Sequence, residues 1–287
     1  MRILQLLINN KCGLCCDYCV SNMNQLGVQD VETFIDRIGM DKYVEHIDRI
    51  FGKYYPMSML IGSGEPTDYP NFIEFCNHFL DQKNSMRVIS NLEHVDRILQ
   101  IKDKTRLEIE ASFHLDSYLR NGKIPDDLIE RYKKLYDSGV HIVNVITPLS
   151  PLVLANYSEY ARLIQEISVY VDVICPIQMY HIYHGQEYPK SYTEQEAVMV
   201  KDILRKYGRK LQVEDVRDVS NTTFSKGKLC RVFDLVAMVS IDGDIWHCQS
   251  QPQIILGNIE TYDGDVYTSP QPCSAEFCLC SAFYDSY

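Results

Sequence analysis

Strand and helix signals alternate between residues 2 and 207, and this alternation restricts the fold more than any other feature of the sequence. Short apolar segments predict six strands, at residues 2–8, 57–61, 86–89, 107–113, 141–146 and 171–174. Apolar residues near a 3.6-residue period predict helices at residues 31–51, 71–82, 93–101, 126–138, 155–168 and 193–207. Six such units require a parallel sheet with crossover helices, either a doubly wound sheet or all or part of a barrel. In both folds, functional groups gather where strands end.

The pattern changes near residue 210, where short strands, glycine-containing turns and cysteines replace the alternation. We therefore expect two domains, at residues 1–209 and 210–287. The charge-rich segment 201–217 is expected to be a solvated helix face and a linker.

Acidic residues outnumber basic ones, with 39 Asp and Glu against 28 Lys and Arg and a net charge of −11. This balance disfavours nucleic acid as a partner, because phosphate binding depends mainly on Lys and Arg. The longest stretch without charged side chains, residues 138–158, contains Pro148, Pro151 and His141, which a membrane helix rarely tolerates. The apolar segment at residues 3–8 is too short for a signal peptide. We therefore expect a cytoplasmic chain with neither nucleic acid nor a membrane as a partner.

Eleven cysteines are an unusual number for a chain without an export signal. Disulfides are rare in a reducing compartment, so metal or redox chemistry becomes the expected use of these thiols. Four of them lie between residues 12 and 19 and five between residues 230 and 280, whereas Cys76 and Cys175 stand alone. The sequence therefore predicts two separate cysteine sites.

The first group contains Cys12, Cys16 and Cys19 in the spacing Cys-x3-Cys-x2-Cys, directly after the first predicted strand. Three thiolates on one short loop can bind three irons of a [4Fe–4S] cluster and leave the fourth iron open. A structural zinc or a ferredoxin-type loop is the alternative. With the aromatic Tyr18 before its last cysteine, the motif resembles that of the radical S-adenosylmethionine (radical SAM) superfamily. The resemblance gives no ligand role to Cys15, which we expect to pack inward.

A second motif, Gly62-Ser63-Gly64-Glu65-Pro66, follows the second predicted strand, where the superfamily has a Gly-Gly-Glu-Pro-like segment. Ser63 replaces one of the usual glycines. Glycines let backbone polar groups approach the methionyl ammonium of S-adenosylmethionine, and Glu65 can add negative charge. A tight turn without a binding role is the alternative.

Other contacts with S-adenosylmethionine follow only from the order of the strands. Asn91 after the third strand, and Glu110, Ser112 or His114 near the end of the fourth, are candidates for binding its carboxylate and ribose. Tyr18 is expected to lie against the adenine. Strand alternation puts Glu110, Ser112 and His114 on one face. A polar lining of the barrel mouth without direct contact is an equal alternative.

The C-terminal cysteines have the order Cys230-x12-Gly-x4-Cys248 and then Cys273-x4-Cys278-x-Cys280. This order resembles the auxiliary-cluster domains called SPASM or, when shortened, Twitch. A full SPASM domain has seven or more cysteines, so the five here imply one auxiliary [4Fe–4S] cluster. The resemblance makes Cys230 and Cys248 ligands and draws two more from the last three cysteines. Zinc is the alternative, although this tail lacks the usual Cys-x2-Cys pair.

One thiol of these five would then be left over. It could donate a hydrogen atom to a substrate radical, as in related epimerases, or simply be buried. Without a donor, the auxiliary cluster can accept an electron from the radical, which gives net oxidation.

The segment after the sixth predicted strand, residues 178–185, contains two histidines and two tyrosines. We expect it to be a loop at the barrel mouth that contacts the substrate. The spacing of His181 and His184 is not that of a zinc helix motif, and we expect no acidic partner for this pair, so a metal site is not expected.

The resemblance implies a partial (β/α)6 TIM-like barrel with a Twitch-type domain, two [4Fe–4S] clusters, S-adenosylmethionine, and a flavodoxin- or ferredoxin-type reductant. An electron from the reduced cluster would break a carbon–sulfur bond of S-adenosylmethionine, and the 5′-deoxyadenosyl radical would remove a substrate hydrogen atom. We expect oxidation or epimerisation of a small metabolite, such as a sugar alcohol or antibiotic precursor, because no segment before Cys12 is available to recognise a peptide. Modification of an amino-acid side chain or peptide is the second hypothesis. A non-catalytic iron–sulfur electron carrier is the third.

Overall fold

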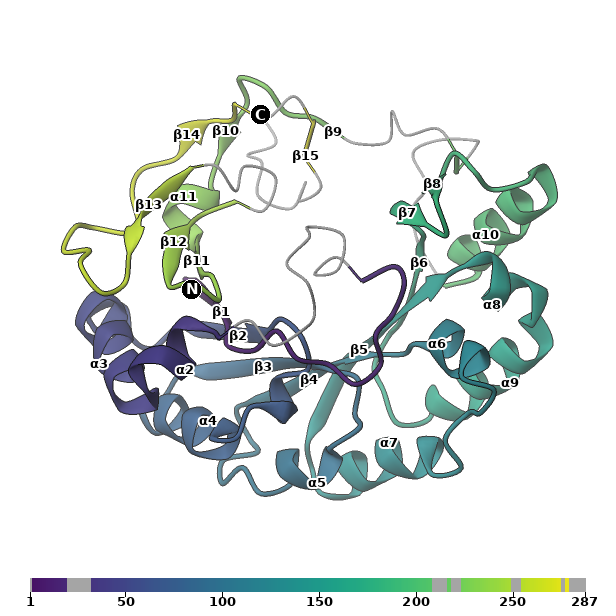
Figure 1. Ribbon diagram of the computed structural model, residues 1–287, viewed down its shortest axis with the longest axis horizontal. Helices are drawn as coiled ribbons and strands as arrows, with labels where there is room; N and C mark the ends of the chain where they lie inside the picture. Colours follow the sequence, from purple (N-terminus) through teal and green to yellow (C-terminus); the bar gives the residue numbers. More distant parts are fainter. Residues whose placement is uncertain are drawn as a thin grey trace.

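The computed structural model describes residues 2–19, 32–207, 216–217, 223–248, 254–274 and 277–278. The six barrel strands are β1 (Ile3–Leu7), β2 (Ser58–Gly62), β3 (Ser85–Ser90), β4 (Leu107–Ser112), β5 (His141–Leu149) and β6 (Ile174–Gln178). Each pairs in parallel with the next. Three more strands extend this sheet beyond β1: β11 (Val236–Val239), β12 (Asp244–Trp246) and β13 (Ile255–Asn258). The sheet is curved, with one concave face (Figure 1), so the predicted partial (β/α)6 barrel is confirmed.

Helices cover the convex face of the sheet (Figure 1). The helices are α2 (Phe34–Ile38), α3 (Met40–Phe51), α4 (Phe72–Asp81), α5 (Val95–Ile98), α6 (Leu115–Arg120), α7 (Leu128–Asp137), α8 (Pro151–Ala155), α9 (Tyr157–Ile167), α10 (Glu194–Lys206) and α11 (Val232–Leu235), with short 3-10 turns η1 (Gly52–Tyr54) and η2 (Pro66–Asp68). In the part of the chain that the structure describes, no helix is both long and apolar enough to cross a membrane.

The burial of side chains alternates along the strands, so that one face of the sheet is fully buried and the other only partly buried. On β1, Leu4 and Leu6 are fully buried, whereas the neighbouring side chains are only partly buried. The buried residues meet apolar side chains spaced three and four residues apart on the helices, such as Tyr43, Ile47 and Ile50 of α3. Full burial of one large apolar side chain contributes about 1.5–3 kcal/mol. The partly buried side chains lie on the opposite face of the strand, away from these helices.

Gly39 divides the region that was predicted as one helix over residues 31–51. Its φ of 83° is incompatible with a continuing helix, so α2 ends before it and α3 begins after it. Thr33 caps α2 by accepting a hydrogen bond from the backbone N–H of Asp36. Residue 31 lies outside the described residues.

The sixth strand was predicted too early, at residues 171–174, because β6 runs from Ile174 to Gln178. Pro176 lies inside it and has no N–H to donate, which an edge strand tolerates. The segment 178–185 is not a loop throughout, as was predicted. It contains the end of β6 and all of β7 (His181–Tyr183), which forms a hairpin with β8 (Gln186–Tyr188).

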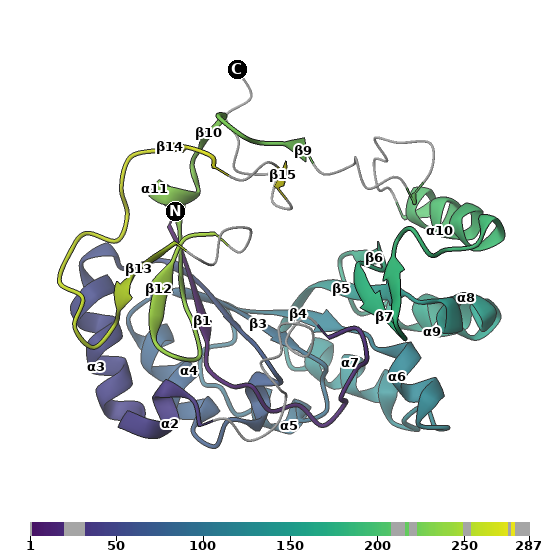
Figure 2. The same cartoon turned by 45° about the horizontal axis from the view of Figure 1, so that its top comes forward.

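Some of the C-terminal strands belong to the barrel sheet, and the others form short separate pairs. β11 pairs in parallel with β1, and β12 and β13 continue in antiparallel order. Short pairs, β10 (Leu229–Cys230) with β14 (Gln271–Pro272) and β9 (Thr223–Phe224) with β15 (Phe277–Cys278), lie above the concave side (Figure 2). The predicted boundary between residues 209 and 210 lies outside the described residues and stays a prediction.

Candidate functional site

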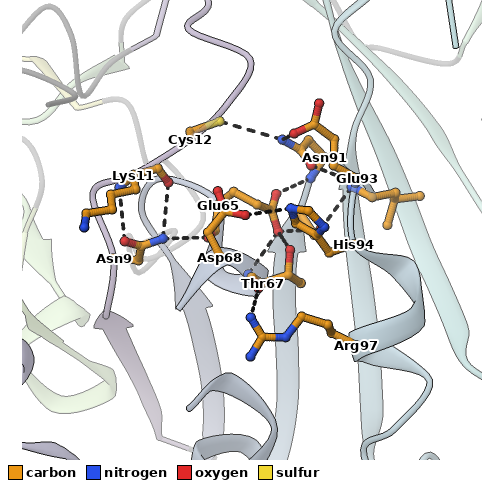
Figure 3. A network of polar contacts seen from close by, with 12 residues as sticks. Asn9, Lys11, Cys12, Glu65, Thr67, Asp68, Asn91, Glu93, His94 and Arg97 are labelled. Carbon is orange, nitrogen blue, oxygen red and sulfur yellow. Dashed lines mark hydrogen bonds and ion pairs between the residues drawn. The ribbon is translucent and has the colours of Figure 1, made fainter. Parts of the chain in front are cut away.

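The loops that follow β1 and β2 meet at the carboxyl edge of the sheet (Figure 3). The side-chain amide of Asn9 donates to the backbone oxygen of Glu65 at 2.8 Å, and the Glu65 N–H donates to the backbone oxygen of Lys11 at 2.7 Å. Lys11 immediately precedes Cys12. The start of the cysteine loop is therefore held by the loop that carries the second predicted motif.

Glu65 joins that second loop to the loop after β3. It is 1% exposed, and its Oε1 accepts hydrogen bonds from the backbone and hydroxyl of Thr67 and from the hydroxyl of Ser90. Its Oε2 accepts from the backbone N–H of Asn91 at 2.7 Å. Burial raises the pKa of Glu65, and these hydrogen bonds oppose the rise. Its predicted role beside the methionyl ammonium stays a prediction.

Gly64 allows the first two loops to approach each other closely. Its φ is 54°, and a Cβ built on it would lie 2.5 Å from the backbone oxygen of Lys11 and 2.9 Å from that of Asn9. Ser63 also has a positive φ, 71°, which costs a non-glycine residue about 1–2 kcal/mol. Gly62 has more room, because its Cβ would meet only Ile89 Cδ1, at 3.5 Å. The backbone of this motif is therefore strained at Ser63 and tightly packed at Gly64.

Two of the three predicted ligand sulfurs receive hydrogen bonds from side chains. Asn91 Nδ2 lies 3.7 Å from Cys12 Sγ, and Ser117 Oγ donates to Cys16 Sγ at 3.0 Å. The third cysteine, Cys19, is partly buried, and its backbone N–H donates to the Cys16 oxygen at 3.0 Å. Donors toward sulfur stabilise the thiolate form that binds metal.

This donor set fits an iron–sulfur cluster. Burial raises the pKa of Cys12 to about 12 and that of Cys16 to about 11, so iron binding must displace a proton from each thiol. Among the described residues, no three His, Cys, Asp or Glu side chains converge as ligands of a single metal ion. In a [4Fe–4S] cluster each thiolate binds its own iron.

Cys15 does not pack inward, and the prediction that it does is wrong. Its side chain is exposed, and its φ of 44° puts it at the outside of a turn. Its sulfur lies 3.6 Å from the backbone oxygen of Cys12. The loop must turn here to bring both neighbouring cysteines inward, and Cys15 is the residue left facing water.

Tyr18 connects the cysteine loop to the residues that follow β4. Its hydroxyl is hydrogen-bonded to His114 Nδ1 at 2.9 Å, and its ring is near the ring of Tyr183, at a centroid distance of 6.3 Å. Burial lowers the pKa of His114 to about 4, so this imidazole is neutral at neutral pH. The predicted contact of Tyr18 with adenine stays a prediction.

A buried carboxylate, Asp116, connects α6 to the β7–β8 hairpin. Its side chain is 0% exposed and accepts hydrogen bonds from Arg120 Nε at 2.8 Å, from the hydroxyl of Tyr183 at 2.7 Å and from the hydroxyl of Ser150. Arg120 also donates to Asp17 of the cysteine loop at 2.7 Å. Asp116 and Arg120 therefore hold the hairpin and the cysteine loop to the same helix.

His184 has an acidic neighbour that the sequence alone did not reveal. Its Nε2 lies 3.4 Å from Oδ2 of Asp17, so the expectation that the histidine pair has no acidic partner is wrong. His184 and Asp17 contribute only two such groups, and the expectation that the segment is not a metal site is unchanged. His181 belongs to β7.

Glu110 and Ser112 lie on the concave face of β4, where burial alternates along the strand. Glu110 Oε2 accepts a hydrogen bond from Asn144 Nδ2 at 3.1 Å. One layer lower, Arg87 forms an ion pair with Glu108 at 2.7 Å. Direct contact of Glu110 or Ser112 with S-adenosylmethionine, and the alternative of a polar lining without contact, both stay predictions.

Three of the C-terminal cysteines come together in a small apolar cluster of their own. Cys230 and Cys273 are buried in it, and Cys248 packs against it. The pairing of β10 with β14 brings the first two close, since Cys230 lies opposite Gln271. Cys278 belongs to β15, and Cys280 lies outside the described residues, so the choice of remaining ligands stays a prediction.

Trp246 packs against the same apolar cluster as the C-terminal cysteines. Its indole Nε1 is buried with no hydrogen-bond partner in the part of the chain that the structure describes. A buried donor without a partner is rare in a finished structure. A sulfur-rich group bound among these cysteines would supply an acceptor, so the site fits an auxiliary cluster.

Sequence reasoning did not single out Asp116, Ser117 or Arg120. Asp116 and Arg120 stand four residues apart, a spacing that could have marked an ion pair on one helix face. The helix itself was not predicted, because α6 is only six residues long. Nothing in the sequence marks Ser117, whose partner sulfur is 101 residues away.

Comparisons with known proteins bear on the fold. No protein-family model and no curated protein sequence matches this chain. The structure of Streptococcus suis SuiB bound to S-adenosylmethionine is similar, with a TM-score of 0.58 at 17% identity over 92% of this chain. The structure of native anSMEcpe with bound AdoMet and Cp18Cys peptide has a TM-score of 0.54 at 13% identity over 91% of this chain.

This chain covers 64% of the SuiB chain and 78% of the anSMEcpe chain. At such low identity the likeness concerns the fold alone. The chain therefore has the fold of radical SAM enzymes, as the resemblance of its motifs implied.

Proposed function

We propose that this protein is a radical SAM enzyme. The observation that carries the proposal is the junction at Glu65, which ties the Gly62–Glu65 loop to Asn91, whose side chain in turn reaches the Cys12 sulfur. A [4Fe–4S] cluster on the cysteine loop, once reduced by one electron, would supply the chemistry that breaks a carbon–sulfur bond of S-adenosylmethionine. The resulting 5′-deoxyadenosyl radical would remove a hydrogen atom from the substrate. Cys12, Cys16 and Cys19 would hold the cluster.

The protein's own residues hold the geometry for this reaction. Gly64 keeps the two loops in contact, and Glu65 fixes the loop after β3 against both. Tyr18, His114 and Tyr183 enclose one side of the cysteine loop with neutral rings. The concave face, with Glu110 and its neighbours, would receive the substrate.

Within this proposal, the first reaction is oxidation or epimerisation of a small metabolite, with an auxiliary cluster on Cys230, Cys248 and two of the last three cysteines. A peptide substrate is the second candidate. It is favoured by structures of the same fold, because SuiB has been solved with the precursor peptide SuiA, and anSMEcpe with Cp18Cys. A flavodoxin- or ferredoxin-type protein would be the reductant.

Anaerobic reconstitution tests the proposal. We expect about eight irons per chain, and 5′-deoxyadenosine when dithionite and S-adenosylmethionine are added. Replacing Cys12 by Ala should abolish both the first cluster and the product. Cys15→Ala is the matched control, because this exposed thiol lies in the same loop and should leave both unchanged. A protein that holds full iron yet never cleaves S-adenosylmethionine would instead be an electron carrier.

The substrate class is tested by supplying metabolite and peptide pools to the active enzyme. Loss of two hydrogens from one component indicates oxidation. A product whose mass is unchanged in H2O but which gains one deuterium at carbon in D2O indicates epimerisation. Single replacements of Cys273, Cys278 and Cys280 then test the spare thiol. A variant that keeps both clusters but no longer completes epimerisation identifies a hydrogen donor, and loss of a cluster in every variant contradicts that role.

A further inference from the structure

Two side chains from different elements donate hydrogen bonds to sulfurs of the cysteine loop. Ser117 lies on α6 and Asn91 follows β3, so the two donors reach the loop from separate directions. The sequence does not predict that either residue acts on sulfur, since it makes Asn91 a candidate contact of S-adenosylmethionine and nothing in it marks Ser117. The orientation of each donor can be derived from its other hydrogen bonds.

The hydroxyl of Ser117 has only one hydrogen, and the side chains around it are those of Cys16, Arg120 and Tyr18. Arg120 Nη2 lies 3.4 Å from Ser117 Oγ, and a guanidinium can only donate. Ser117 therefore accepts from Arg120 and keeps its own hydrogen for the Cys16 sulfur, 3.0 Å away. Ser117 is 0% exposed and Cys16 is 5% exposed, so water does not compete for this hydrogen bond.

The amide of Asn91 is oriented in the same way. Its Oδ1 accepts from the backbone N–H of Glu93 at 2.9 Å, which settles which end of the amide is oxygen. The Nδ2 group then faces Cys12 Sγ at 3.7 Å and the Glu93 carboxylate at 3.5 Å. The backbone N–H of Asn91 is held by Glu65, so the position of the amide is fixed by two loops.

We propose that Ser117 and Asn91 are positioning residues that raise the reduction potential of the cluster bound by Cys12, Cys16 and Cys19. The inference rests on the proposed function. Reduction adds one electron from a low-potential donor such as dithionite to the cluster and its sulfurs, and no bond is made or broken. Hydrogen bonds to the sulfurs stabilise the more negative, reduced state, and such bonds are one of the factors that set cluster potentials.

The test is an anaerobic redox titration of the reconstituted full chain, followed by electron paramagnetic resonance without S-adenosylmethionine. The signal that disappears in Cys12→Ala identifies the relevant cluster. Ser117→Ala should lower its reduction equilibrium constant about tenfold, which is about 59 mV for a one-electron couple. Ser117→Thr keeps the hydroxyl and should restore the potential. Ser138→Ala is the matched control, because that hydroxyl donates to a backbone oxygen of α7 instead.

Asn91→Ala should lower the potential in the same direction, and the double variant should combine both effects because the donors share no partner. An unchanged potential in an iron-loaded Ser117→Ala protein overturns the proposal. If that variant does not retain iron, Asn91→Ala decides the matter by the same criterion. A wild-type chain without any reducible cluster would instead refute the proposed function, so the two failures can be told apart.

Discussion

Asp116 places a carboxylate where water does not reach it, and Arg120 provides the compensating charge. The ion pair is completed by the hydroxyls of Tyr183 and Ser150, so the buried oxygens have several donors. Removing only the cation leaves an uncompensated buried charge, which is far more costly than losing an exposed ion pair.

We therefore expect Arg120→Met to destabilise the apoprotein by about 3–5 kcal/mol. Arg162→Met is the control, because Arg162 makes exposed contacts with Glu159 and Glu166 and should cost at most about 1 kcal/mol. Urea unfolding under anaerobic conditions gives both values. Equal losses for the two variants would show that Asp116 does not depend on Arg120.

His114 predicts a pH dependence of stability. Burial lowers its pKa from 6.5 to about 4 in the folded protein, so between these values the unfolded chain binds more protons than the folded one. Its contribution is therefore complete above the unfolded pKa and is lost as the pH falls toward the folded pKa.

Between about pH 7 and about pH 5, wild type should lose about 2 kcal/mol more of its unfolding free energy than His114→Gln. Ser138→Ala is the control variant, because it removes no group that titrates in this range, and it should follow wild type. Urea titrations at the two pH values give the comparison. Parallel pH profiles for wild type and His114→Gln would contradict the inferred burial effect.

At this scale the sequence identified Cys12, Gly64 and Glu65 because each belongs to a short motif with a fixed spacing. It could not identify Ser117 or Asp116, whose partners are brought near only by folding. The prediction that Cys15 is buried was wrong for a related reason. The spacing shows which thiol is surplus, but the direction of its side chain depends on the local φ of the backbone.

At the scale of elements, the site depends on how closely the loops after β1 and β2 approach. Gly64 is the contact point, since any Cβ there would overlap the backbone before Cys12. Gly139 offers a matched comparison, because its φ is also positive, 78°, but nothing lies within 4 Å of its Cβ position.

Gly139→Ala should cost about 1–2 kcal/mol from backbone strain alone. Gly64→Ala should cost about 1–3 kcal/mol more, because the loops must separate to accommodate the methyl group. Urea unfolding measures the difference, and iron content after reconstitution shows whether the cysteine loop still forms its site. If both variants lose the same stability and retain full iron, the close approach is not required.

Strands and helices with a clear apolar pattern could be predicted from the sequence. Elements that depend on pairing with a distant or very short strand could not. Five of the predicted barrel strands overlap the observed ones closely, because each is a short apolar run followed by a helix. The β7–β8 hairpin was missed because its strands are three residues each. The break between α2 and α3 at Gly39 was not predicted, because apolar residues continue at helical spacing on both sides of it.

At the scale of the whole molecule, one sheet connects both predicted cysteine sites. β1 leads directly into the cysteine loop at one end and pairs along its other side with β11. The sequence could not show this pairing, since the two strands are separated by more than 200 residues. The C-terminal apolar cluster therefore rests on the same strand from which the first cysteine loop begins.

Trp246 is the only tryptophan in the chain and packs against that C-terminal cluster. An iron–sulfur cluster on Cys230, Cys248 and Cys273 absorbs in the range of indole emission, so its assembly should quench most of the protein's tryptophan fluorescence. The apoprotein should be bright, and the reconstituted protein dim. Cys273→Ser should stay largely bright after reconstitution, because this replacement removes one of the candidate ligands.

Cys12→Ala provides the opposite control for this prediction, because it removes a thiol from the other cysteine site. It should lose the first cluster but keep most of the quenching, since Trp246 packs against the C-terminal cysteines. Iron content and emission are measured on the same samples. If quenching is lost in Cys12→Ala and kept in Cys273→Ser, the C-terminal cysteines do not hold a cluster beside Trp246.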